Sequence, residues 1–93
     1  MLQGMLTRKQ VKMARAALNW SVRDLAAQAG VTANTISRYE NGSDALTETL
    51  LKIRRAFEQH GVIFIPENGG GAGVRLRDRE SDEIKPGEPV SPA

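Results

Sequence analysis

Two short helical segments, joined by the four residues Ala29-Gly30-Val31-Thr32, constrain the fold of this chain most strongly. Gly30 permits the positive φ angle that a sharp turn between two helices requires. Ala26, four residues earlier, is small enough for the next helix to pass close by, and Ile36, six residues later, is large enough to fill the angle between the helices. The spacing therefore predicts two angled helices, the second of which projects from the body of the domain.

Capping signals place three helices around this turn. Thr7 and Gln10 fit a capping box, which predicts a first helix over residues 7–19, and Ser21 to Asp24 repeats the pattern for a second helix that ends at Gly30. Thr32 is positioned to cap a third helix over residues 33–40. In this third helix, Ile36 and Tyr39 share one side. Four residues are expected to face outward: Ala33, Asn34, Ser37 and Arg38. A projecting helix of this size fits the major groove of B-DNA.

The rest of the chain reads as one more helix, a hairpin and a tail. A fourth helix is predicted over about residues 47–60, and Gly61 ends it. The apolar run at 62–65, the glycine-rich loop after it and the alternation at 74–77 predict a β-hairpin over residues 62–77. Residues 79–93 are polar and proline-rich, so we expect a disordered tail. The chain thus divides into a mainly α domain of four or five helices (1–61), a short hairpin extension (62–78) and the tail (79–93).

Composition excludes several classes of protein. A chain of 93 residues with no cysteine and one histidine is too short for the large enzyme scaffolds, and it has no thiolate nucleophile and no site built from several imidazoles. We therefore expect no enzyme, no cofactor and no metal site. The N-terminus lacks the pattern of a secretory signal, and no apolar run approaches the roughly 20 residues of a membrane span. A cytoplasmic protein without a membrane partner is the expectation.

Charge is unevenly distributed along the chain. Residues 1–40 carry six basic and two acidic side chains, a net charge of +4, whereas residues 41–78 are neutral and residues 79–93 carry −2. A basic N-terminal half attracts polyanions, although a solvated surface has the same composition.

The turn and its flanking residues resemble the Xre, or phage-repressor-like, family of helix-turn-helix transcriptional regulators. The similarity covers residues 5–60. The matching residues are Leu18-Asn19-Trp20-Ser21, Asp24-Leu25-Ala26, Ala29-Gly30-Val31, Thr35-Ile36-Ser37-Arg38-Tyr39-Glu40-Asn41-Gly42 and Leu50-Leu51-Lys52-Ile53. The resemblance implies a lambda-repressor-like domain that binds double-stranded operator DNA, usually as a homodimer, and acts as a repressor or autoregulator.

The same resemblance makes 33–40 the recognition helix and assigns roles to its residues. Asn34 would offer its amide to adenine and Arg38 its guanidinium to guanine or to a phosphate. Thr35 and Ser37 would donate single hydrogen bonds, and Ala33 would meet only a thymine methyl group. Contacts to the phosphate backbone are expected from Arg23, Thr32, Asn41 and Gly42.

Two departures from the family pattern leave alternatives open. Val22 stands where the family often has a glutamine that touches the DNA backbone, and Ala33 stands where it often has a basic or long polar residue. One alternative is an antitoxin whose hairpin and tail neutralise a toxin protein partner. The other is a protein-interaction module that kept the fold without tight DNA binding. The hairpin over 62–77 is also a candidate dimer interface, because a two-stranded sheet needs cover for its face and edges.

Some conspicuous residues are expected to serve the fold. Trp20 and Tyr39 are interpreted as core aromatics, and His60 as a residue that interacts with the end of the fourth helix. The glycines of 69–73 lack the Lys-Ser/Thr of a phosphate-binding loop and are interpreted as the tip of the hairpin.

Overall fold

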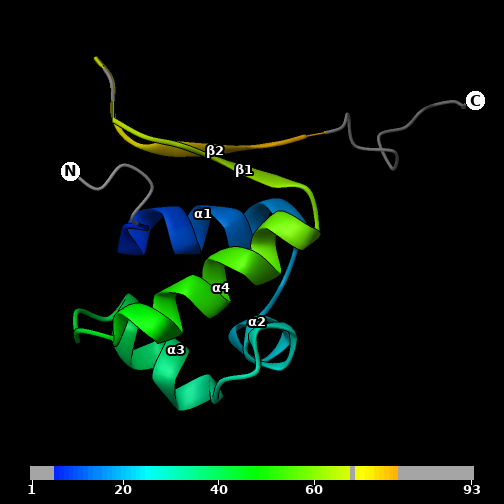
Figure 1. Cartoon of the computed structure of the whole chain (residues 1–93), viewed down its shortest axis with the longest axis vertical. Helices are drawn as coiled ribbons and strands as arrows, with labels where there is room; N and C mark the ends of the chain where they lie inside the picture. Colours follow the sequence, from blue (N-terminus) through cyan, green and yellow to red (C-terminus); the bar gives the residue numbers. More distant parts are fainter. Residues whose placement is uncertain (1–5, 68, 78–93) are drawn as a thin grey trace, which may run out of the picture.

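The computed structural model describes residues 6–67 and 69–77, and it contains four helices followed by a two-stranded hairpin (Figure 1). The helices are α1 (Arg8–Leu18), α2 (Val22–Ala29), α3 (Ala33–Glu40) and α4 (Thr47–Gln59), and the strands are β1 (Val62–Ile65) and β2 (Gly73–Leu76). This confirms the mainly α fold with a C-terminal hairpin. The tail expected over 79–93 lies outside the described residues.

The helix boundaries follow from the predicted caps. At the start of α1, the backbone N–H of Gln10 donates to the Thr7 hydroxyl at 3.1 Å, and the backbone N–H of Thr7 donates to the Gln10 side-chain oxygen at 3.1 Å. The two bonds complete the capping box. Ser21 and Asp24 make the same reciprocal pair at the start of α2. Asn19 ends α1 in the left-handed conformation, with φ 59°. Local hydrogen bonding therefore sets where each of these helices begins and ends.

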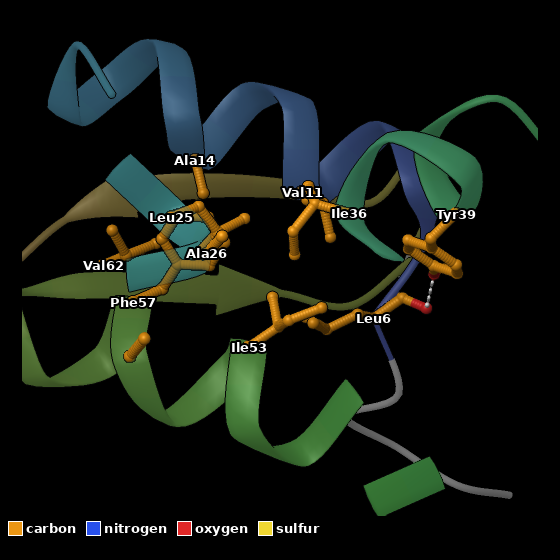
Figure 2. Packing of buried hydrophobic residues seen from close by; sticks show 11 residues of the cluster. Leu6, Val11, Ala14, Leu25, Ala26, Ile36, Tyr39, Ile53, Phe57 and Val62 are labelled. Atoms are coloured by element: carbon orange, nitrogen blue, oxygen red, sulfur yellow. Dashed lines mark hydrogen bonds between the residues drawn. The ribbon is translucent and has the colours of Figure 1, made fainter. Parts of the chain in front are cut away.

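Four helices and the first strand contribute to one hydrophobic core. Its largest fully buried side chains are Phe57, Leu25, Ile36, Ile53 and Val11, and Figure 2 shows the cluster between the helices. Trp20 stacks on Phe57 with ring centroids 5.6 Å apart. The His60 ring lies edge-on to Trp20, and its Nδ1 is 2.9 Å from the Ala56 carbonyl oxygen near the end of α4. Trp20 thus packs on the core, as expected.

The hairpin lies along α1, at the opposite end of the domain from α2 and α3 (Figure 1). Its antiparallel register pairs Val62 with Leu76 and Ile65 with Gly73. Gln10 is only 3% exposed, and its side-chain Nε2 donates to the carbonyl oxygens of Ile65 (3.2 Å) and Gly73 (3.0 Å). Because the same amide also closes the capping box of α1, one glutamine fixes the end of the hairpin to the first turn of that helix.

A nearly buried ion pair joins the C-terminal half of α1 to the end of α3. Arg15 donates from Nε and Nη2 to the two carboxylate oxygens of Glu40, each at 2.8 Å, and from Nη1 to the Trp20 carbonyl at 3.1 Å. The Glu40 side chain is 7% exposed. Hydrogen bonding to Glu40 raises the pKa of Arg15 above its already high ordinary value. The pair is bidentate, the geometry in which arginine and carboxylate interact most strongly.

Replacement of Glu40 by alanine tests this ion pair. Loss of one partner leaves the Arg15 guanidinium partly buried without its counter-ion, so we expect Glu40→Ala to lower the free energy of unfolding by about 3–5 kcal/mol. The control is Glu58→Ala, which removes an i,i+4 ion pair with Arg54. The Glu58 side chain is 46% exposed. The control should cost about 0.5 kcal/mol or less. Urea denaturation followed by circular dichroism measures both changes, and equal losses would contradict the account.

Alkaline titration tests the burial of Tyr39. Burial raises the pKa of its phenol above the ordinary 10.0, and the positive charge of Arg8 offsets part of that rise. The folded state therefore holds the phenolic proton more tightly than the unfolded state, so this contribution to stability is complete below about pH 10 and is lost as the pH rises through the folded pKa. Tyr39 is the chain's single tyrosine, so tyrosinate absorbance should show one midpoint above 10.0. A midpoint at or below 10.0 would show that the phenol is solvated.

Candidate nucleic-acid interface

The turn between α2 and α3 depends on the backbone conformation of Gly30. Its φ is 76° and its ψ 33°, and the amides of Gly30 and Val31 both donate to the Ala26 carbonyl, at 2.9 and 3.1 Å. A Cβ atom at Gly30 would meet nothing within 4 Å. The glycine is therefore required for its positive φ and not for space.

Thr32 is the N-cap of α3, and its hydroxyl makes the capping hydrogen bond. Its backbone is extended, and its Oγ1 accepts from the Thr35 amide at 3.1 Å and lies 2.9 Å from the Thr35 hydroxyl. The amides of Ala33 and Asn34 make no hydrogen bond within the described part of the chain. These two donors, at the positive end of the α3 dipole, are the groups that can receive an anion there.

The two sides of α3 have different surroundings. Ile36, Tyr39 and Glu40 are buried against the rest of the domain, whereas Asn34 and Arg38 are exposed. Thr35 and Ser37 are half-buried. Ala33 is half-buried and packs on the core, so its predicted outward orientation is only partial. The exposed side of α3 thus presents an amide and a guanidinium.

The residues that follow α3 form a tight turn. The Asn41 side chain donates to the Ser37 carbonyl at 2.9 Å, and its backbone amide donates to the carbonyls of Ser37 and Arg38. Gly42 has a φ of 114° and is exposed. The contact to the DNA phosphate backbone that we expect from Asn41 and Gly42 would therefore come from a turn whose own hydrogen bonds are already made.

Beside Arg38 the surface is hollowed. An open depression of about 230 Å³ lies between α3, the loop after it and the start of α4, and its lining residues are Thr35, Arg38, Asp44, Ala45, Leu46 and Thr49. Leu46 is the N-cap of α4 and supplies no side-chain hydrogen bond to the helix, unlike the caps of the other three helices. Sequence analysis did not identify Asp44 to Leu46 or Thr49 as part of the site. The signal in the sequence that could have found them is Leu46, an apolar residue at a position where the start of a helix usually has a capping side chain.

The basic residues of the N-terminal half divide between fold contacts and the exposed surface. Arg15 is bound to Glu40. The Arg8 guanidinium donates to the Tyr39 carbonyl in the last turn of α3 and to the Gly42 and Ser43 carbonyls after it, and it stacks over the Tyr39 ring, 4.9 Å from its centroid. The other four remain exposed: Lys9 and Lys12 on α1, Arg23 in the first turn of α2, and Arg38. Two of the six basic side chains of residues 1–40 therefore stabilise the fold, and Arg38 lies with Asn34 on the exposed side of α3.

A family model described as helix-turn-helix matches residues 11–60, which include all four helices except the first three residues of α1. The chain belongs to the helix-turn-helix family. Its type is the Xre, phage-repressor-like one, so the chain is a DNA-binding regulator, and this family of domains is not enzymatic. No curated protein is similar enough to the chain to match it. Among the described residues, none of the helices combines the length and hydrophobicity needed to cross a bilayer.

The two departures from the helix-turn-helix pattern have packing roles. Val22 and Ala33 are the first residues of α2 and α3, and both are partly buried against the hydrophobic core. Each therefore stabilises the motif, so their apolar character does not by itself indicate a loss of DNA binding.

Substitutions at Gly30 test the geometry of the turn. A residue with a Cβ atom is strained at φ 76°, so we expect Gly30→Ala to lower the free energy of unfolding by about 1–2 kcal/mol. Gly30→Asn should cost less, because asparagine tolerates this conformation, as Asn19 does here. Gly70, whose φ is not positive and whose surroundings are open, supplies the control Gly70→Ala. Thermal denaturation compares the variants with the wild type. Equal thermal stability of all the variants would contradict the claim that the turn is strained by a residue with a Cβ atom.

Proposed function

We propose that this protein is a sequence-specific regulator that binds double-stranded operator DNA by placing α3 in the major groove. The observation that carries the proposal is the two-sidedness of α3: Ile36 and Tyr39 anchor one side, and Asn34 and Arg38 are exposed on the other. A short helix with one side buried against the domain and the other side exposed to solvent has the geometry of a recognition helix.

The exposed groups match the chemistry of base edges and phosphates. Arg38 would donate two hydrogen bonds to guanine or one to a phosphate, and Asn34 would pair with adenine. Thr35 and Ser37, being half-buried, would add single hydrogen bonds from the edge of the helix. The unpaired amides of Ala33 and Asn34 would receive one phosphate, and Arg23 would approach the backbone from α2.

The hollow beside Arg38 is where a DNA strand leaving the groove would run. It is bounded by the uncapped first turn of α4, whose amides and dipole favour an anion. Asp44 also lines it and would repel a phosphate, so the strand would pass on the side of Arg38 and Thr49. A small domain seated in this way covers its operator and excludes other proteins, and repression or autoregulation is the simplest outcome.

We also propose that two copies act together through the hairpin. The inner side chains Val62, Phe64 and Leu76 are packed on the helices, whereas Ile65 and Arg75 are exposed. In the described part of the chain no third strand covers either edge of the sheet. Pairing of one edge with its copy would create a two-fold axis, and such dimers bind half-sites about 34 Å apart.

Selection of bound fragments from random duplex DNA, followed by substitution of Arg38, tests the proposed function. We expect enrichment of one sequence, with palindromic symmetry if two copies bind. On that duplex Arg38→Ala should weaken binding by about 1–3 kcal/mol, with less discrimination at one base pair, because the bidentate contact is lost. Arg55→Ala, which removes an exposed arginine from the outer surface of α4, is the matched control.

Two results would contradict the proposal. The first is a wild-type protein that enriches no duplex sequence. The second is a folded Arg38→Ala variant that binds the enriched duplex as tightly as the wild type and the Arg55→Ala control.

A further inference from the structure

One arginine of α1 organises the loop that follows the recognition helix. Arg8 Nε donates to the Tyr39 carbonyl at 2.8 Å, and its Nη2 donates to the carbonyls of Gly42 (2.9 Å) and Ser43 (3.0 Å). The same nitrogen lies 3.6 Å from a carboxylate oxygen of Asp44. A single guanidinium thus gathers the end of α3 and the three residues Gly42 to Asp44.

This loop is part of the proposed DNA-binding surface. It joins α3 to α4, and Asp44 lines the hollow together with Arg38 and Thr49. Carbonyl oxygens at the C-terminal end of a helix carry partial negative charge and would repel a nearby phosphate. Because Arg8 binds the Tyr39 carbonyl at this end together with the Gly42 and Ser43 carbonyls, it fixes the loop relative to α3.

We propose that Arg8 is a positioning residue for DNA binding. It does not touch DNA; it acts by holding the loop over 41–44, so that α3 and the start of α4 present one rigid surface. The inference rests on the proposed function, because it concerns the affinity of that surface for its operator.

The chemistry of the side chain separates this role from a direct phosphate contact. Three carbonyl oxygens are bound by two nitrogens of one planar group, and the lysine ammonium cannot reproduce that fork. A cation that contacts a phosphate, in contrast, acts mainly through its charge, which lysine retains. Arg8→Lys and Arg8→Gln should therefore be equally harmful if Arg8 positions the loop.

The experiment compares the wild type with Arg8→Lys, Arg8→Gln and the control Lys9→Gln. Lys9 is exposed one residue further along α1 and makes no ion pair within the described residues. Two quantities are measured on samples that circular dichroism shows to be folded: the dissociation constant for the selected duplex across a salt series, and hydrogen exchange of the amides of Asn41, Gly42 and Ser43 in the free protein. These amides are hydrogen-bonded in the turn, so their exchange reports its order.

We expect both Arg8 variants to bind the duplex about 3- to 30-fold more weakly, with the slope of log K against log salt unchanged and faster exchange in the loop. Lys9→Gln should leave loop exchange unchanged and weaken binding less than either Arg8 variant does.

Three results would overturn the proposal. Wild-type affinity in Arg8→Lys, together with a slope shallower by about 0.9 in Arg8→Gln, would show a direct phosphate contact. Faster loop exchange with unchanged DNA binding would show that the loop does not matter for binding. An equal loss of affinity in Lys9→Gln and Arg8→Gln would show a general effect of charge. A wild type that enriches no duplex contradicts the proposed function itself and removes this inference with it.

Discussion

The attachment of α3 to α1 by the Arg15–Glu40 ion pair is the constraint on which the position of α3 depends. Two charged groups with little exposure are costly to desolvate, and only a geometry that satisfies their hydrogen bonds offsets that cost. The bidentate contact at 2.8 Å, with a third bond to the Trp20 carbonyl, meets that condition. Any displacement of α3 along its axis would break it, so the pair fixes the position of the helix more strictly than apolar packing alone would.

α1 connects the two ends of the molecule. Its first turn binds the end of the hairpin through Gln10 and the loop after α3 through Arg8, and its last turn binds Glu40 through Arg15. The outer side of α3, with Asn34 and Arg38, takes no part in these contacts. The arrangement separates the residues that hold the fold from those left exposed on α3, although arginine occurs in both sets.

Local signals in the sequence predicted most of the fold. The capping boxes at Thr7 and Ser21 and the left-handed glycine at position 30 act within a few residues, so they can be read without the tertiary structure, and the helix boundaries agree with them to within one residue. The destinations of the long side chains could not be read in this way. Gln10 reaches a strand 55 residues away and Arg8 a loop 34 residues away, whereas the local sequence pattern indicates only that both belong to the first helix. The depression beside Arg38 was missed for the same reason, because it is assembled from α3, a loop and α4.

The central claim is that the exposed side of α3 is the surface that meets DNA, and amide chemical-shift mapping tests it most directly. The selected duplex is titrated into the ¹⁵N-labelled protein, and shifts are followed for every assigned amide. We expect the largest changes over residues 32–38, the loop over 41–46 and the first turn of α4, with small changes in β1 and β2. Large changes confined to the hairpin and the outer surface of α1, with α3 unaffected, would contradict the claim.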